Sequence, residues 1–248
     1  MNIKQVSDYT GISRDMIRFY EKKGIIHPAR KENGYRDYTI HDLLLLVTAR
    51  QYSCLGIPLS TIAQLSREQD TSLIQRELHA SAARIEEETF WLSQQLFTAK
   101  YMEQIFRMAS ENRQFEVIKH TSFVYYERTS ANHFQNQLAS ISARPVLRIR
   151  NRLLEKDAYP NDQGMVFQKP LRTQQPFESY AEGTFFRFLF TLPADAKLPP
   201  SAVRPMLKQI RENGYSPSGD AFLTMLLGTP DRSTDDLIVL EFEIQKAK

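Results

Sequence analysis

The feature that most constrains the fold is a long stretch, residues 71–113, that contains neither proline nor glycine. Its apolar residues recur every seven positions, and two more follow four residues after a member of this series: Leu78, Ala82, Ile85, Leu92, Leu96, Ala99 and Phe106. This spacing predicts one amphipathic helix of about forty residues, about 60 Å long at 1.5 Å per residue. Thr89 and Glu103 interrupt its apolar seam.

A helix of this length exceeds the core of a small domain. We therefore expect its seam to pair with that of a second chain, as a coiled-coil dimerisation helix. The alternative is that the seam packs along the C-terminal domain of its own chain. In both cases the helix separates regions of different composition, so the sequence predicts a multidomain chain divided into residues 1–70, 71–113 and 114–248.

The first seventy residues have the pattern of short helices joined by tight turns. The segment "IKQVSDY" predicts a first helix that Gly11 ends. Ser13 is a suitable N-cap for a second helix, which runs to about Lys23 and stops at Gly24. Two helices around a short glycine-containing turn predict a helix-turn-helix, and the second helix carries cations on its outer side.

A hairpin is expected next, because the Asn33-Gly34 pair is a strong turn signal between strand-forming residues. Such a hairpin would form a wing. Helices are expected over about 41–54 and within "GIPLSTIAQL". Together these elements predict an N-terminal all-α winged helix-turn-helix domain.

Positive charge is concentrated in this region. Residues 14–36 contain seven Lys or Arg and three Asp or Glu, a net charge of +4, whereas the whole chain has a net charge of +3. Such a local excess suits a polyanion, although an ordinary solvated helix face could produce it as well.

Beyond residue 114 the composition shifts to aromatic, β-prone segments separated by prolines. "FEVIKHTSFVYYERT", "VLRIR" and "MVFQK" predict strands, and Phe134, Leu138 and Ile141 have helical spacing. The order then repeats in "GTFFRFLFTL", "SAVRPMLKQIRENGY", "DAFLTMLLG" and "DLIVLEFEI". Two strand-helix-strand-strand units predict a C-terminal α+β domain with one antiparallel sheet and both helices on one face.

Several classes of protein are disfavoured. The single Cys54 cannot form an intramolecular disulfide, and we expect it to be a buried small hydrophobe. No signal-like N-terminus is present, and the longest apolar run, Leu43–Val47, is too short to span a bilayer. We therefore expect a cytoplasmic protein without a membrane partner.

Catalytic and metal-binding motifs are also missing from the sequence. The five histidines are scattered, with no ligand-spaced pair among them or with the cysteine. The chain has no glycine-rich phosphate loop and no G-x-S-x-G motif. We expect no metal, no cofactor and no enzymatic activity.

The N-terminal motifs "GISRDMIRFYEKKGII", "ENGYRDY" and "LGIPLSTIAQL" resemble the DNA-binding domain of the MerR family of transcription regulators. The helix after them occupies the place of the family's antiparallel dimerisation coiled coil. From about residue 114 the segments "EGTFFRFLF", "LKQIRENGYSPSGD" and "DLIVLEFEIQ" resemble a GyrI-like effector-binding domain of multidrug-sensing members. The chain departs from the family pattern at Met16 and Phe19, where relatives usually carry hydroxyl side chains.

The resemblance implies a homodimer that binds double-stranded promoter DNA, bends and underwinds it, and realigns it for RNA polymerase when a small effector binds. The residues expected to contact DNA supply cations or polar groups on the second helix and the wing. They are Ser13, Arg14, Arg18, Tyr20, Lys22, Arg30, Tyr35 and Arg36. Tyr35 could instead pack beneath the wing, and Ile17 is expected in the core.

The same resemblance implies an aromatic pocket closed by a buried carboxylate that selects cationic, lipophilic compounds. The candidate residues are Tyr125, Tyr126, Phe167, Phe186, Phe188, Glu241 and Glu243. Phe186, Phe188 and Phe190 share one face of their strand, and the two glutamates share one face of theirs. Two alternatives stay open: the aromatic residues could be ordinary core, and the C-terminal domain could be a small-molecule hydrolase or bind a protein.

Overall fold

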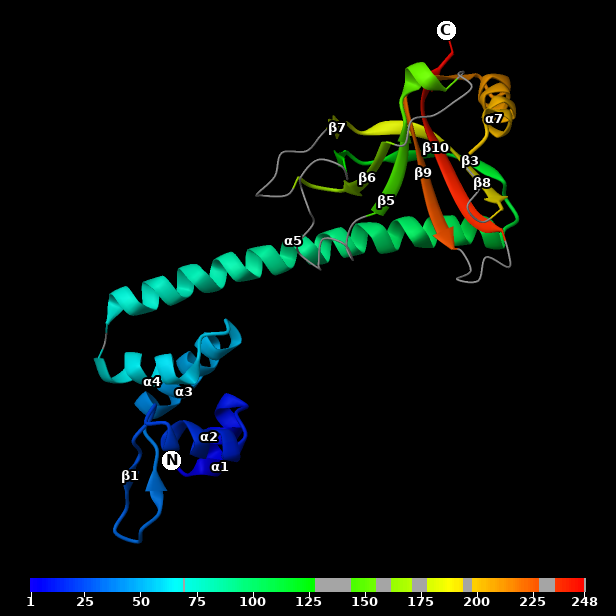
Figure 1. The fold of residues 1–248 in the computed structure, drawn as a ribbon. Helices are drawn as coiled ribbons and strands as arrows, with labels where there is room; N and C mark the ends of the chain where they lie inside the picture. Colours follow the sequence, from blue (N-terminus) through cyan, green and yellow to red (C-terminus); the bar gives the residue numbers. More distant parts are fainter. Residues whose placement is uncertain are drawn as a thin grey trace. The chain divides into compact units, whose positions relative to one another are not determined.

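The computed structural model describes most of the chain, in the ranges 1–68, 70–127, 144–154, 162–170, 178–193, 198–227 and 235–247. Two compact units, Met1–Thr89 and Phe90–Lys248, are described one after the other (Figure 1). Helix α5, Thr71–Ser110, contributes its first half to one unit and its second half to the other. The long helix predicted from the apolar spacing is confirmed.

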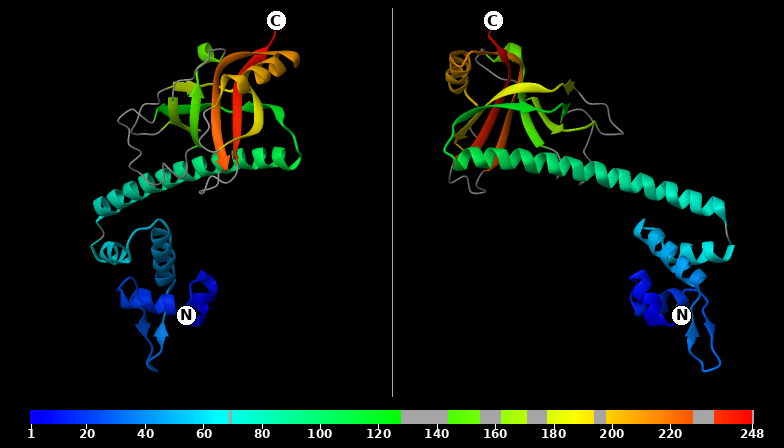
Figure 2. Two further views of the ribbon diagram at one scale, coloured as in Figure 1. Left: turned by 45° about the vertical axis from the view of Figure 1, so that its right-hand side comes forward. Right: turned by 180° about the vertical axis from the view of Figure 1, so that it is seen from behind.

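The first unit contains short helices and a two-stranded antiparallel hairpin before α5 begins (Figure 2). Its elements are α1 (Ile3–Thr10), α2 (Arg14–Lys22), β1 (Ala29–Arg30), β2 (Arg36–Asp37), α3 (Ile40–Cys54) and α4 (Leu59–Glu68). Val6, Ile17, Leu46 and Ile62 bring one buried side chain from each helix into a common core. The predicted helical arrangement of this unit and the burial of Ile17 are confirmed.

Local signals place the start of α2. The backbone of Ser13 is extended, and its Oγ accepts a hydrogen bond from the Met16 N–H at 3.2 Å. The preceding Gly11 has φ +64°, a left-handed conformation that costs glycine little. This cap and turn set α2 against α1, with Ile17 pointing inward.

Helix α5 presents two different faces. The predicted seam is exposed along its whole length: Leu78, Ala82, Ile85, Leu92, Leu96, Ala99 and Phe106. Another face is buried within its own chain, at Trp91, Tyr101, Ile105 and Met108. Packing along the C-terminal domain therefore occurs, but it uses a face different from the seam.

The first half of α5 is fastened to the turn after α3. The carbonyl oxygen of Leu55 accepts hydrogen bonds from the Ser81 hydroxyl and from Arg84 Nη2, the latter at 2.6 Å. Gly56 follows with φ +79°, and a Cβ there would meet the Arg84 guanidinium. The left-handed backbone conformation favours a glycine here, and the Arg84 guanidinium occupies the space beside it.

The second unit is built on an eight-stranded sheet in the order β3-β8-β10-β9-β5-β6-β4-β7, and its pairs are antiparallel. The strands are β3 (Phe115–His120), β4 (Phe123–Glu127), β5 (Arg144–Ile149), β6 (Asp162–Phe167), β7 (Glu178–Tyr180), β8 (Gly183–Leu192), β9 (Tyr215–Leu227) and β10 (Asp236–Lys246). A short 3-10 helix (Asn151–Leu153) follows β5, and α7 (Pro200–Glu212) follows β8.

These elements confirm the predicted antiparallel sheet and the helix between its later strands. The single strand expected over "FEVIKHTSFVYYERT" is two strands, β3 and β4, separated by residues 121–122. The three-residue β7 was not predicted. The expected helix with Phe134, Leu138 and Ile141 lies outside the described residues.

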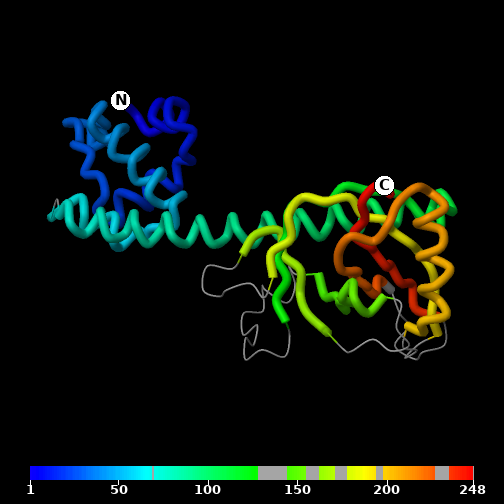
Figure 3. The backbone as a smooth tube through the Cα atoms, turned by 90° about the horizontal axis from the view of Figure 1, so that it is seen from above, coloured from blue at the N-terminus to red at the C-terminus, as the bar shows by residue number. Residues whose placement is uncertain are grey.

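The sheet is strongly curled. The ring of Phe123 on β4 lies 6.2 Å from the ring of Phe185 on β8, although β10, β9, β5 and β6 separate these strands in the sheet order. The face that carries both rings is therefore concave. Helix α7 lies on the opposite face (Figures 1 and 3), where its Val203, Leu207 and Ile210 cover a hydrophobic core. The curl creates two separate environments, one on each side of the same strands.

Candidate functional site

The outer side of α2 carries exposed cations. Arg14, Arg18, Lys22 and Lys23 are all exposed, because the helical period that buries Ile17 turns them outward. Arg18 makes an exposed ion pair with Asp15 at 3.2 Å, one turn away on the same helix. Such a pair is weak in water and leaves the guanidinium accessible to a polyanion.

The β1–β2 hairpin adds further exposed groups. Arg30 and Lys31 lie on one arm, and Tyr35, at the turn, is 74% exposed. The alternative in which Tyr35 packs beneath the hairpin is therefore wrong. Gly34 has φ +80°, as the Asn33-Gly34 turn requires.

Tyr20 and Arg36 differ from the other predicted DNA contacts. Tyr20 is 2% exposed and belongs to the core, so its side chain is unavailable to a surface ligand; burial also raises its pKa. Arg36 Nε donates to both carboxylate oxygens of Glu21, at 2.9 and 2.7 Å. This bond fastens β2 to α2, and it raises the pKa of Arg36. Arg36 thus sets the position of the hairpin relative to the basic helix face.

The free thiol does not behave as predicted. Cys54 is exposed, at the last position of α3, so the expectation of a buried small hydrophobe is wrong. The apolar period of α3 buries Leu46 and Ala49 and turns position 54 outward.

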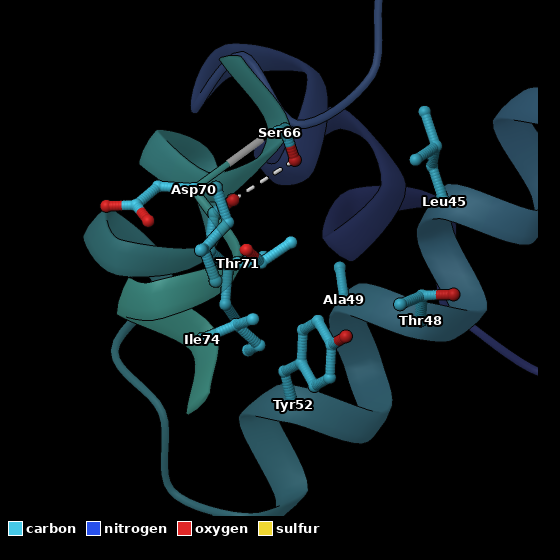
Figure 4. A pocket seen from close by; sticks show the side chains of 10 residues that line it. Leu45, Thr48, Ala49, Tyr52, Ser66, Asp70, Thr71 and Ile74 are labelled. Atoms are coloured by element: carbon cyan, nitrogen blue, oxygen red, sulfur yellow. Dashed lines mark hydrogen bonds between the residues drawn. The ribbon is translucent and has the colours of Figure 1, made fainter. Parts of the chain in front are cut away.

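A groove of about 300 Å³ lies between α3, α4 and the start of α5 (Figure 4). Figure 4 shows Ala49 and Tyr52 of α3 facing Ile74 of α5, with Asp70 at the side. The predicted DNA-binding residues do not line it, and its walls are mainly apolar.

In the second unit, the predicted effector residues are divided between the two faces of the sheet. Tyr125, Glu241 and Glu243 lie on the concave face, because Glu241 pairs across the sheet with Arg187 and Glu243 with Phe185. Phe186 and Phe188 alternate with these residues and pack beneath α7.

Tyr126 and Phe167 also lie away from the concave face. Their rings are 5.4 Å apart and pack with Trp91 of α5. The single pocket that combined all seven residues is therefore wrong: strand alternation places four of them in hydrophobic packing on the opposite face.

Phe188 does border a second groove, of about 570 Å³, between the end of α5, β8 and α7. Phe190, Met206 and Leu237 contribute to its wall. No carboxylate among the described residues lines it, so its described wall offers no charge that would select a cation.

Glu241 is buried at 1% exposure, and its charge is compensated. Its carboxylate accepts hydrogen bonds from Arg144 Nη1 at 2.9 Å and Arg187 Nε at 2.7 Å, and His120 Nε2 lies 3.1 Å away. Burial alone would raise the pKa of Glu241, but the nearby His120, Arg144 and Arg187 hold it well below its usual value. Glu241 is therefore committed to an internal ion cluster, which argues against roles as a general base or as the ligand's counter-ion.

Glu243 lies two residues further along the same face in a different setting. It is half-buried, opposite an irregularity in the pairing of β9 with β10. A Cβ at Gly219 would collide with its carboxylate, and one at Gly183 would lie 3.7 Å from its Oε1. Burial raises the pKa of Glu243, and the charge of Asp220 raises it further. Gly219 thus leaves room for a carboxylate that no described cation neutralises.

Aromatic rings occupy the concave face near this carboxylate. Phe123 stacks on Tyr180 at 4.9 Å, and Phe222 meets both rings edge-on at 5.4 and 5.1 Å. The Tyr180 hydroxyl donates to Asp220 at 2.9 Å. This bond links the aromatic group to the carboxylate whose charge acts on Glu243.

A third buried arginine, Arg148, orders the neighbouring strands. Arg148 binds Asp162 at 2.7 Å and Glu178 at 2.9 Å, and its guanidinium lies 4.2 Å from the centre of the Tyr125 ring. The Tyr125 hydroxyl donates to Asp162 at 2.6 Å. Tyr125 is therefore part of a structural network beside the concave face.

Sequence reasoning missed most of these partners. Arg187 interrupts the apolar run "TFFRFLF", a signal that one strand position faces a polar environment. Arg144, His120, Tyr180 and Asp220 gave no comparable signal, because only the register of distant strands brings them together.

Among the described residues, no three or more His, Cys, Asp or Glu side chains are grouped to hold a metal ion. No described helix is long and apolar enough to cross a lipid bilayer.

Known proteins resemble mainly the first unit. Residues 2–38 match the family model described as MerR family regulatory protein. Over 55 residues the chain is 51% identical to the HTH-type transcriptional regulator CueR of Escherichia coli O6:H1, covering 21% of this chain and 41% of that protein. CueR of Vibrio cholerae O1 (Classical Ogawa 395) is 47% identical over 55 residues, covering 21% and 40%. The chain thus spans about two fifths of the length of these curated relatives.

Among solved structures, the chain is similar to HiNmlR, a MerR family regulator lacking the sensor domain, bound to promoter DNA. The match has 22% identity and a TM-score of 0.39, and it covers 45% of this chain and 94% of that one. The EcmrR–DNA complex has 14% identity and a TM-score of 0.36, covering 100% of both chains. Scores this low add nothing to the description of the fold.

Proposed function

We propose that this chain, whose residues 2–38 match the model of the MerR family regulatory proteins, is a transcription regulator that binds promoter DNA. The observation that carries the proposal is the exposed basic face of α2 with the hairpin fastened beside it. Arg14, Arg18 and Lys22 supply phosphate-binding cations on a short exposed helix. Arg30 and Tyr35 extend the surface along the hairpin, which acts as the wing.

We further propose that the chain acts as a homodimer through the exposed seam of α5. Leu92 and Leu96 are 63% and 56% exposed, a large apolar area for the surface of one chain. Their heptad spacing suits knobs-into-holes packing against a second α5. The three-part division into residues 1–70, 71–113 and 114–248 then corresponds to DNA binding, dimerisation and effector sensing.

The concave face of the second unit is proposed as the effector site. Glu243 offers a carboxylate that no described cation neutralises, and Phe123, Tyr180 and Phe222 offer ring faces and edges nearby. This combination suits a lipophilic cation, whose charge is stabilised by a desolvated carboxylate and by aromatic faces. Binding would then change the promoter geometry presented to RNA polymerase. Glu243 takes the role that the sequence also offered to Glu241.

The regulator proposal is tested with fluorescent DNA from upstream of the chain's own gene. Full-length protein should bind this duplex more tightly than a scrambled duplex, and affinity should fall with added salt because cations meet phosphates. Equal affinity for both duplexes at every salt concentration would contradict sequence-specific regulation.

The dimer is tested separately by light scattering of the full chain. The wild type should have twice the mass of one chain, and Leu92→Glu should halve that mass by placing a charge in the seam. Glu103→Gln, at a position that already interrupts the seam, is the matched control and should stay dimeric. A monomeric wild type at micromolar concentration would refute the proposal.

A further inference from the structure

The buried ion cluster around Glu241 reaches one side chain of α5. Tyr101 is 3% exposed, and the Arg144 guanidinium carbon lies 3.9 Å from the centre of its ring. Arg187 approaches the same ring at 5.1 Å. Both arginines also bind Glu241, so the aromatic ring from α5 and the carboxylate from β10 share the same two cations.

A chain of ring contacts joins this cluster to the Glu243 site. Phe185 is the cross-strand neighbour of Glu243. The Phe185 ring meets the His120 ring edge-on at 4.8 Å, and His120 lies 6.1 Å from the Tyr101 ring at an interplanar angle of 25°. The groups are buried and closely packed, so a shift at one end displaces its neighbours.

The position of Tyr101 on α5 gives this contact its importance. Tyr101 faces the sheet, while Leu96, Ala99 and Phe106 of the same helical segment face outward along the seam. Rotation or translation of α5 at Tyr101 would therefore move the seam by a comparable amount, because the helix is one rigid element between these residues.

We propose that Tyr101 is a positioning residue through which the state of the Glu243 site is communicated to α5, by way of Phe185, His120 and the two arginines. The proposal rests on the proposed effector site and adds its route of regulation. A ligand at Glu243 displaces Phe185, the packing of His120 against Tyr101 changes, and the orientation of α5 follows. Sites linked in this way have reciprocal effects on each other.

The decisive experiment uses no ligand. Amide hydrogen exchange of residues 90–108 is measured in the full chain, with Glu243→Gln as the perturbation at the site. The substitution should change the exchange rate of this α5 segment about fivefold in the wild type and in Tyr101→Phe, which keeps the ring. In Tyr101→Leu, which removes the ring, the same substitution should change it less than about twofold.

An equal effect of Glu243→Gln in all three backgrounds would overturn the proposal, and so would the absence of any effect. If Tyr101→Leu also loses protection in β8 and β10, then His120→Gln replaces it. That variant breaks the ring contacts but leaves both arginine–Glu241 pairs in place, and it should likewise abolish the response of α5.

A ligand experiment separates this proposal from the effector class. Trp91, the only tryptophan of the chain, belongs to α5 and packs against Tyr126 and Phe167. Tetraphenylphosphonium should change its fluorescence in the wild type and in Tyr101→Phe, but not in Tyr101→Leu, although equilibrium dialysis detects bound cation in all three. Retention of the fluorescence change in Tyr101→Leu would refute the route through Tyr101. Failure of the cation to bind the wild type would instead refute the proposed class of effector, and the hydrogen-exchange experiment would still test the route.

Discussion

The arginines of the two units lie in opposite environments, exposed on α2 and buried in the second unit. On α2, Arg14 and Arg18 are exposed, and the only ion pair described for them is the weak Arg18–Asp15 contact. In the second unit, Arg144 and Arg187 are buried and compensated by Glu241. Arg14 and Arg18 can take part in binding a polyanion because they are solvated, so their charges need no acidic partner in the protein. The second pair must keep an acidic partner, since an uncompensated buried charge is strongly unfavourable.

The largest effect that this contrast predicts is on stability. Glu241→Gln should lower the free energy of unfolding by about 3–5 kcal/mol, because Arg144 loses its buried counter-charge and Arg187 keeps only its pair with Glu116. Urea unfolding of the full chain, followed through Trp91, measures the change. The pKa of Glu241 is depressed, so its contribution to stability is present at neutral pH and is lost only as the pH falls through that low value.

Arg18→Ala is the matched control for this measurement. It should change the free energy of unfolding by less than about 0.5 kcal/mol, since the side chain is exposed. A loss of similar size in the two variants would contradict the division into structural and functional arginines.

The same contrast explains which features could be predicted from the sequence. The exposure of Arg18 and the burial of Ile17 follow from the helical period, which relates residues only three or four positions apart. The seam of α5 is also a local pattern, and it is exposed in the single chain. The partners of Glu241 were not predictable, because Arg144 and Arg187 lie 97 and 54 positions away and meet it only through sheet register.

The division of the predicted aromatic residues between the two faces of the sheet has the same cause. Phe186 and Phe188 share a face, as predicted, and so do Glu241 and Glu243. Which pair faces α7 depends on how β8 aligns with β10, and a shift of one residue would reverse the outcome. The alternation of side chains within one strand could be predicted from the sequence. The alignment of one strand with the next could be seen only in the folded structure.

The second prediction concerns binding by the exposed arginines. Arg18→Ala should weaken DNA binding by about 1–3 kcal/mol if the side chain reads a base edge. A phosphate contact would instead reduce the salt slope by about 1 and weaken all sequences equally. Fluorescence anisotropy at several salt concentrations distinguishes the two contacts, and unchanged affinity for the upstream duplex would remove α2 from the proposed interface.

The third prediction contrasts the two glutamates of β10. Glu243→Gln should lower the affinity for tetraphenylphosphonium about tenfold, while the neutral triphenylphosphine oxide loses little. The raised pKa of Glu243 means that any stability it contributes is present at low pH and is lost as the pH rises through the raised value. The variant should therefore be no less stable than the wild type at pH 7, unlike Glu241→Gln.

Binding of the cation should also depend on pH in the wild type. As the pH falls through the raised pKa of Glu243, the carboxylate is protonated and the affinity declines; the Glu243→Gln variant should show no such decline. Isothermal titration calorimetry between pH 4 and pH 8 would reveal this difference. If affinity has the same pH dependence in the wild type and in Glu243→Gln, another residue recognises the charge.

The smallest effect is expected at Arg36, an arginine of the first unit that behaves partly like those of the second. Its ion pair with Glu21 is half-exposed, with side-chain exposures of 37% and 23%, so Arg36→Gln should cost about 0–1 kcal/mol of stability. DNA affinity should nevertheless fall, because the hairpin loses its attachment to α2. The salt slope should stay unchanged if Arg36 positions the hairpin, and it should fall by about 1 if Arg36 neutralises a phosphate.

A charge exchange sharpens this last test. Glu21→Arg combined with Arg36→Glu preserves the pair with its polarity reversed, so an attachment role predicts that the double variant recovers affinity relative to either single change. A contact role predicts no recovery, since position 36 is then acidic and faces phosphate. Recovery at constant salt slope would place Arg36 with the structural arginines of the sheet, although it lies on the surface beside Arg18.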